Sequence, residues 1–112
     1  MAHFTILSLS TERNFFYNST HFLSQEVLGL FNSYDEALTA VEKLGRVFYE
    51  NVCKMTSEEI KKRGLKEEDV EDDIFPDWDW SGESFSVDYC KGLSQDVLIT
   101  RQFIIKEIKE LS

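Results

Sequence analysis

Carboxylates and aromatic rings are concentrated in residues 67–83. This segment holds nine acidic residues and no basic one: Glu67, Glu68, Asp69, Glu71, Asp72, Asp73, Asp77, Asp79 and Glu83. Phe75 and both tryptophans of the chain, Trp78 and Trp80, lie among them. Acidic side chains attract cations and basic surfaces, and aromatic rings are enriched among the residues that dominate protein interfaces.

The first hypothesis for this segment is a docking surface for a basic partner protein. Inhibitors, immunity proteins and nucleic-acid mimics present carboxylates in this way, where phosphates would otherwise bind. The residues predicted to contact the partner are Glu68, Asp69, Asp72, Asp73, Phe75, Asp77, Trp78, Asp79 and Trp80. The simpler interpretation is a solvated acidic loop whose tryptophans fold back onto the core, and the sequence leaves both open.

A calcium site is the second hypothesis for the same residues. Asp77–Glu83, with Asp88 five residues further on, has the D-x-D-x-S-G spacing of a calcium loop and resembles an EF-hand over these residues only. The ligands would be Asp77, Asp79, Ser81, Glu83 and Asp88. Pro76 stands where an entering helix should end, and a simple turn at Ser81–Gly82 explains the glycine equally well. Ca²⁺ is the only cofactor that the sequence suggests.

Catalytic motifs are missing from the sequence. It contains no Gly-rich phosphate loop, no H-E-x-x-H and no G-x-S-x-G. The two histidines, His3 and His21, fall on or beside predicted strands, which gives neither a role as a general base. Acid–base catalysis would need a desolvated carboxylate, and a segment as charged as 67–83 is expected to be hydrated. We therefore expect that the protein is not an enzyme, and a small enzyme ranks as the last hypothesis.

The net charge limits the possible partners and the compartment. The chain has 112 residues and a formal net charge of −9, of which residues 58–88 account for −8. Direct binding to nucleic acids or anionic membranes is not expected, because both are also negative. No apolar run approaches the roughly 20 residues of a membrane span, and the start of the chain lacks the features of a signal peptide. Cys53 and Cys90 are predicted to be buried free thiols, so we expect a cytoplasmic protein.

A Ser-Tyr-Asp-Glu motif predicts the start of a long helix. Ser33 can cap the first turn, and Glu36 can reach back to complete a capping box. Apolar residues then recur at helical spacing, which predicts an amphipathic helix over 34–54. Gly45 either weakens the middle of this helix or lets it approach a sheet closely.

A second capping box, formed by Thr56 and Glu59, predicts a separate short helix. Gly64 is expected to end it in a left-handed conformation. Residues 66–74 are expected to add one more turn before Pro76 stops it. The sequence therefore predicts one long helix followed by one or two short ones.

Four segments are predicted to be strands, at residues 3–9, 22–32, 85–89 and 97–108. The first has apolar residues on both faces, which is typical of a central strand or one covered on two sides. The last also fits a helix through Ile104, Ile108 and Leu111, but its β-branched residues favour a strand within 97–111.

The predicted order of elements is β-β-α-α-β-β in one domain of residues 1–112. We expect an α+β fold in which the helices cover one face of a four-stranded, mainly antiparallel sheet. Residues 10–20 are predicted to be a loop or irregular hairpin connection with an aromatic cluster at Phe15, Phe16 and Tyr17. Phe15, Phe16, Phe22 and Phe31 are all assigned to the core.

Overall fold

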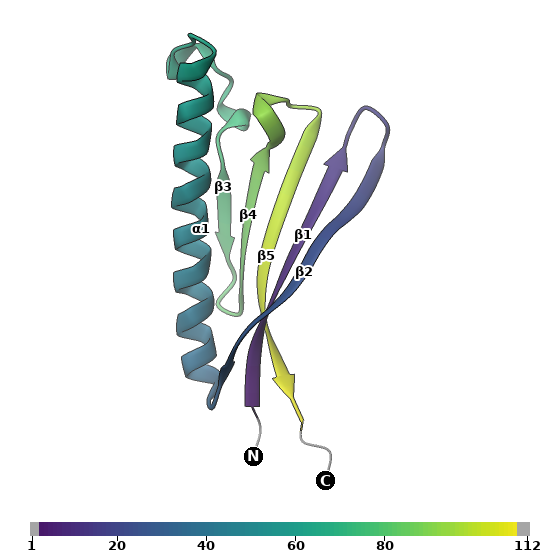
Figure 1. Ribbon diagram of the computed structural model, residues 1–112, viewed down its shortest axis with the longest axis vertical. Coiled ribbons are helices and arrows are strands. Elements are labelled where there is room, and N and C mark those ends of the chain that lie inside the picture. Colours follow the sequence, from purple (N-terminus) through teal and green to yellow (C-terminus); the bar gives the residue numbers. More distant parts are fainter. Residues whose placement is uncertain (1–2, 110–112) are drawn as a thin grey trace.

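A computed structural model describes residues 3–109 of the chain (Figure 1). Five strands form one sheet: β1 (His3–Asn14), β2 (Ser19–Phe31), β3 (Asp77–Trp80), β4 (Ser84–Cys90) and β5 (Val97–Ile108). The helical elements are α1 (Tyr34–Lys62) and three single turns, η1 (Glu67–Asp69), η2 (Asp72–Ile74) and η3 (Lys91–Leu93). The strand order is β2-β1-β5-β4-β3, and every neighbouring pair is antiparallel.

The predicted α+β architecture is confirmed, but the prediction of four strands is wrong. The additional strand is β3, which lies in the segment predicted to be an acidic loop. Asp is depleted in strands, and this masked the Asp-Trp-Asp-Trp alternation, whose period of two is itself a strand pattern. The strand predicted at 97–108 is confirmed as β5, and Leu111 lies outside the described residues.

The first two strands are longer than predicted. β1 runs to Asn14 and β2 begins at Ser19, so most of the predicted loop at 10–20 belongs to the sheet. The physical reason is β5, which pairs with β1 along its whole length, from His3 opposite Ile108 to Asn14 opposite Val97. Paired on both sides, β1 is an interior strand, in agreement with the apolar residues on both of its faces.

The helix predicted at 34–54 and the separate short helix predicted after Thr56 form one continuous helix. The predicted N-cap is confirmed, because the Ser33 hydroxyl accepts a hydrogen bond from the Glu36 N–H at 3.2 Å. Thr56 is not a cap: its hydroxyl donates to the Val52 carbonyl one turn earlier, at 3.0 Å. The buried stripe of α1 continues through Thr56 to Ile60, so packing favours an unbroken helix over a new start.

The core lies between α1 and one face of the sheet. Its fully buried cluster consists of Ile6, Val41, Phe85, Val87 and Phe103. Gly45 places the α1 backbone directly on the Phe85 ring, where an added Cβ atom would collide with the ring. Of the two roles considered for this glycine, the structure supports close approach to the sheet.

The β1–β2 hairpin extends beyond the reach of α1, as Figure 1 shows, with α1 beside β3 and the hairpin turn at the opposite side. The assignment of Phe15 and Phe16, at the hairpin turn, to the core is therefore wrong. The assignment of Phe22 is wrong for a different reason: through Thr11 and Thr100 it shares the sheet face of Asp88, which α1 does not cover. All three side chains are exposed, Phe16 to 76%. Phe31 alone packs against the core cluster, because it lies at the end of β2 that leads into α1. The hydrophobic character of these residues does not indicate which part of the sheet the helix covers.

Replacing Gly45 with Ala tests the close approach of α1. Gly→Ala normally favours a helix by about 1 kcal/mol, whereas overpacking a core costs about 1–3 kcal/mol. We expect Gly45→Ala to lower the free energy of unfolding in urea, because the Phe85 ring must move. Asn51→Ala, at an exposed position of the same helix, is the matched control and is expected to be neutral or slightly stabilising. A Gly45→Ala variant as stable as the parent would contradict the close contact.

Candidate interaction surface

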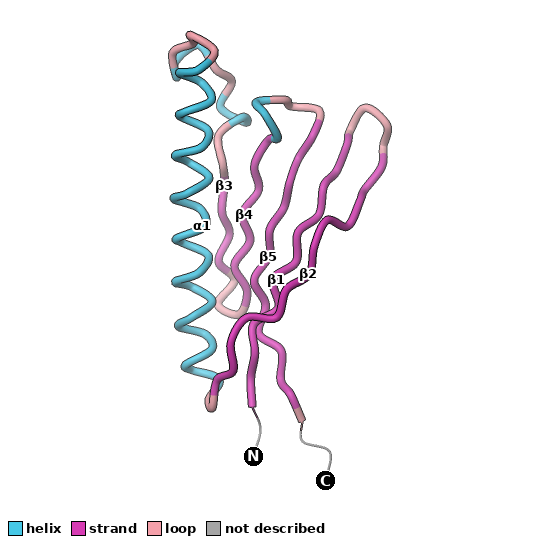
Figure 2. Tube along the Cα trace, in the orientation of Figure 1, coloured by secondary structure: helices cyan, strands magenta, loops and turns pink. Residues whose placement is uncertain are grey.

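The acidic segment follows directly from the way α1 ends. Gly64 adopts the predicted left-handed conformation with φ of +71°, and the Leu65 N–H donates to the Ile60 carbonyl at 3.1 Å. This turn reverses the chain, which then returns along the sheet through η1 and η2 into β3 (Figure 2). The end of α1 therefore fixes where the carboxylates lie.

Two single turns hold the acidic segment in shape. In η1 the Asp69 and Val70 N–H groups donate to Lys66 and Glu67 carbonyls, and in η2 the Ile74 N–H donates to the Glu71 carbonyl at 3.0 Å. Ile74 and Pro76 are buried and attach the segment to the body of the protein. These two apolar residues occupy the inner side, and the carboxylates that precede and follow them are exposed to solvent.

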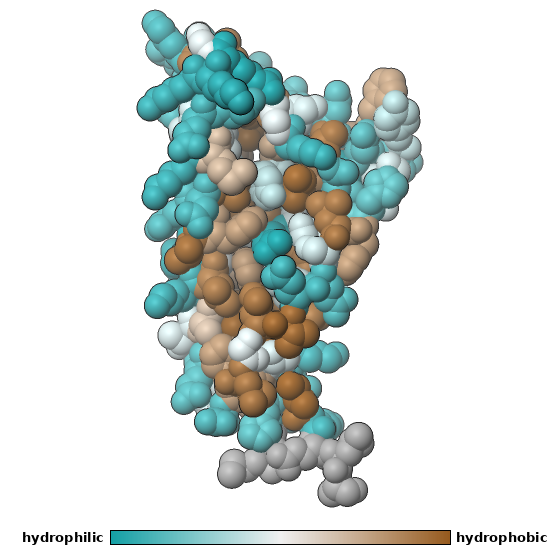
Figure 3. All heavy atoms as spheres, viewed as in Figure 1, coloured by the Kyte–Doolittle hydropathy of each residue, from teal (hydrophilic) through white to brown (hydrophobic). Residues whose placement is uncertain are grey.

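These carboxylates line two adjoining hollows of about 370 and 380 Å³. The first is formed by residues 68–73, and the second by Asp72, Asp73, Phe75, Pro76, Asp77, Asp88, Tyr89 and Leu98. We call the acidic lining residues together the acidic surface: Glu68, Asp69, Glu71, Asp72, Asp73, Asp77 and Asp88. Figure 3 shows hydrophilic residues gathered around the C-terminal end of α1 and hydrophobic residues over the half of the molecule near the start of α1.

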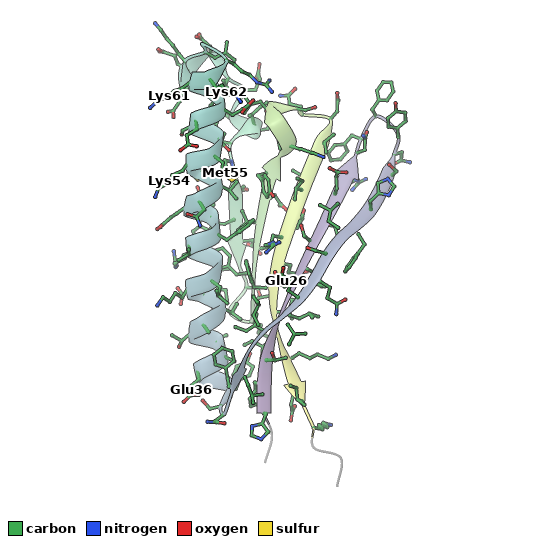
Figure 4. All side chains as sticks on the ribbon, viewed as in Figure 1. Glu26, Glu36, Lys54, Met55, Lys61 and Lys62 are labelled. Atoms are coloured by element: carbon green, nitrogen blue, oxygen red, sulfur yellow. The ribbon has the colours of Figure 1, made fainter. Side chains whose placement is uncertain are left out.

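The charges of the acidic surface are not neutralised within the described chain. The ion pairs of residues 3–109 are Glu42–Arg46, Glu59–Arg63 and Glu12–Lys91, and none of them involves a carboxylate of 67–83. Asp73 accepts one hydrogen bond from the neutral Gln95 amide at 3.0 Å. On α1, Lys54 and Lys61 point away from the sheet (Figure 4). The negative charge of the acidic surface is therefore not offset by these ion pairs.

Asp77 and Asp88 stand directly opposite each other across β3 and β4. Like charges in this position destabilise a sheet. Asp88 accepts a hydrogen bond from the Thr100 hydroxyl at 2.6 Å, and Asp77 accepts one from the Trp78 N–H at 2.9 Å. Neither donor carries a positive charge, so these hydrogen bonds do not neutralise the two carboxylates.

Both tryptophans lie on the other side of β3 from these carboxylates. The Trp78 ring stacks on Phe85 with ring centroids 5.4 Å apart, and the Arg46 guanidinium covers it at 5.3 Å from the ring centroid. Trp80 also contacts Phe85 and packs against the core. Both rings thus contribute to the packing on the helix side, and Trp78 in addition keeps 40% of its surface exposed at the sheet edge.

The predicted partner-binding residues therefore separate into two groups. Glu68, Asp69, Asp72, Asp73, Phe75 and Asp77 lie together around the two hollows. Asp79 follows two positions along β3 on the face that carries Asp77, whereas Trp78 and Trp80 are on the helix side. Sequence reasoning missed Glu71 and Asp88 as members of the surface. The alternation of 85–89 indicates only that Asp88 faces away from Val87 and Tyr89, and its place beside Asp77 follows from strand pairing.

The segment proposed to bind calcium folds as a β-hairpin. Ser81 closes its turn, with its N–H donating to the Ser84 carbonyl at 3.1 Å and its hydroxyl accepting from the Ser84 N–H at 3.1 Å. Gly82 supplies a φ of +89° at the tip. Within residues 3–109 no three His, Cys, Asp or Glu side chains are placed to hold a metal ion. Calcium binding stays a prediction, and this geometry gives it no support.

The two cysteines are free and half-buried. Burial raises the pKa of the Cys90 thiol, and the negative charge of Asp73 raises it further. The Cys90 Sγ donates to the Asp73 carbonyl at 3.4 Å. A thiol held in its protonated form is a weak nucleophile, so Cys90 ties η2 to β4 but does not suggest catalysis.

Asp77→Asn tests the charge repulsion across β3 and β4. Because removing one of two opposed carboxylates relieves the repulsion, we expect the free energy of unfolding to rise by about 0.2–1 kcal/mol at low ionic strength. The gain should shrink in about 1 M salt, where the Debye length is about 3 Å. Asp79→Asn is the matched control, since Asp79 faces the neutral Ser86. Equal effects of the two variants at low salt would argue against a specific Asp77–Asp88 repulsion.

Comparisons with protein families, with curated proteins and with solved structures find no match to this chain. No helix in the described part of the chain is long and apolar enough to cross a bilayer. The function is therefore argued from the acidic surface itself.

Proposed function

We propose that the protein is a small interaction module whose acidic surface docks on a basic surface of a partner protein. It would act as an inhibitor, immunity protein or nucleic-acid mimic does, by occupying a site that otherwise receives negative charge. The proposal places it in the cytoplasm, where its two free thiols would stay reduced.

The observation that carries this proposal is the set of unneutralised carboxylates around two hollows. A protein that needed these charges only for solubility could distribute them over its whole surface. Here six of them follow one another between residues 68 and 77, held by two hydrogen-bonded turns. We expect the opposed Asp77 and Asp88 to lower the stability of the free protein, and a cost in stability is a recurrent trade-off at functional sites.

The shape of the surface suits lysine or arginine side chains. Each hollow is open and lined by several carboxylates, so an incoming cation can be approached by more than one acidic group. Phe75 and Leu98 add apolar lining to the second hollow, where the aliphatic stem of a lysine or arginine can pack. Trp78 contributes an exposed edge at the rim of the same strand.

Neutralising three carboxylates tests the proposal. The ligand is a fluorescently labelled arginine-rich peptide of about 12 residues, and binding is followed by anisotropy at low and high salt. Exposed ion pairs contribute about 0.2–1 kcal/mol each, so Asp72→Asn, Asp73→Asn and Asp77→Asn together should lower the affinity about 3- to 150-fold. The affinity of the parent protein should fall as the salt concentration rises.

The matched control removes the same number of charges elsewhere. Glu50→Gln, Glu58→Gln and Glu107→Gln change three exposed carboxylates outside the acidic surface. This variant has the same net charge as the first and should lose much less affinity. If both triple variants weaken the peptide equally, only the net charge matters and the proposal of a localised docking surface fails.

A further inference from the structure

Exposed hydrophobic side chains gather at a place that the acidic surface does not use. Of the thirteen large hydrophobic residues exposed in the described chain, seven lie between residues 15 and 30. They are Phe15, Phe16 and Tyr17 at the hairpin turn and Phe22, Leu23, Val27 and Leu30 on β2. An exposed hydrophobic cluster of this kind marks an interaction site or an aggregation hazard.

The cluster coincides with a sheet edge. β2 is the outer strand on one side of the sheet, 13 residues long, while the opposite edge is β3, with four residues. Proteins blunt edge strands with charges, prolines or shortness. β3 is short and carries two aspartates, but β2 is long, has no Lys, Arg or Pro, and contains Glu26 as its one carboxylate. β2 is therefore interrupted only by its two register irregularities and is not protected by charge, proline or shortness.

The sequence of β2 is compatible with antiparallel pairing to itself. Residues 24–28 pair regularly with β1, between a bulge that inserts Leu23 and a second irregularity at Gly29–Leu30. A twofold axis through Gln25 places Gln25 opposite Gln25 of the second copy and Ser24 opposite Glu26, where the hydroxyl can donate to the carboxylate. Opposed residues then share a face of the joined sheet, as antiparallel pairing requires. An axis through Glu26 would instead oppose two carboxylates.

Charge also favours this edge for contact between two copies. Each copy carries a formal charge of −9, so association must occur where few acids lie. The acidic surface lies beside β3 and β4, at the edge of the sheet opposite to β2. Pairing through β2 therefore keeps the two acidic surfaces apart, which limits their repulsion.

The exposed apolar area of β2 sets an upper limit on its apolar contribution to a dimer. The four β2 side chains expose roughly 400 Å² per copy, about half of the 800 Å² per partner in a standard interface. Backbone groups and polar side chains of the strand would supply the remainder. We propose that the protein forms a homodimer in which two copies of β2 pair antiparallel, continuing the sheet across a twofold axis near Gln25. This inference is independent of the proposed docking of a basic partner.

Sedimentation velocity of the full chain between about 1 and 100 μM tests the dimer. The parent protein is expected to dimerise, and Val27→Lys should raise the dimer dissociation constant at least about 10-fold, because it places a charge inside the interface. Val47→Lys is the matched control: Val47 is a similarly exposed valine on α1, 47% against 66% for Val27. Circular dichroism melting checks that each variant folds. If Val27→Lys does not fold, Leu30→Lys, whose side chain is also 66% exposed, replaces it.

The outcomes separate this inference from its rivals. Dimers lost with Val27→Lys and kept with Val47→Lys support it, and so does a disulfide-linked dimer formed on oxidation of Gln25→Cys but not of the parent. A parent protein that is monomeric at 100 μM overturns it, as does a dimer lost only with Val47→Lys. Salt gives an independent readout, because screening should strengthen association of two copies with like charge but weaken peptide binding at the acidic surface.

Discussion

The close approach of α1 to the sheet at Gly45 is the constraint on which the rest of the structure depends. With no side chain between the helix backbone and the Phe85 ring, α1 lies directly on β4. In this position α1 packs chiefly on β4 and β5, and most of the β1–β2 hairpin has no helix packed on it. From the end of α1 the chain returns along the sheet, and the acidic segment leads into the edge strand beside β4. Gly45 therefore sets how closely α1 approaches β4, and the turn at Gly64 then directs the acidic segment to the adjacent sheet edge.

The acidic surface is held in place by packing and backbone hydrogen bonds despite its concentrated charge. Its carboxylates are held by hydrogen-bonded turns and by the buried Ile74 and Pro76, and not by attraction between charges. The apolar packing of Trp78 and Trp80 on Phe85 fixes β3 in register, and that register brings Asp77 opposite Asp88. Hydrophobic burial is thus strong enough to hold together two groups that repel each other. A cation bound between them would remove the repulsion and add to the affinity.

Sequence reasoning predicted those parts of the fold that depend on local signals. The Ser33 cap, the turn at Gly64 and the β-branched strand β5 each follow from residues that lie close together in the chain. The missed strand β3 had a local signal that its aspartates masked, whereas the other misassignments depend on distant contacts. Thr56 resembles a cap but continues the buried stripe of α1, and Phe22 resembles a core residue but lies on the sheet face that α1 does not cover. For the acidic surface, composition located the segment, whereas Asp88 joined it only through strand pairing.

The two edges of the sheet differ in length and in charge. The β3 edge is short and acidic, so we expect it to repel copies of itself and, under the proposed function, to attract basic surfaces. The β2 edge is long and nearly uncharged, so its affinity for another strand comes from backbone hydrogen bonds and apolar contact. Because α1 and the interior strands separate the two edges, the two kinds of contact need not compete. A dimer formed through β2 would carry two acidic surfaces at its outer ends, and a partner with two basic sites could then bind both, with an affinity raised by the effective concentration of the second.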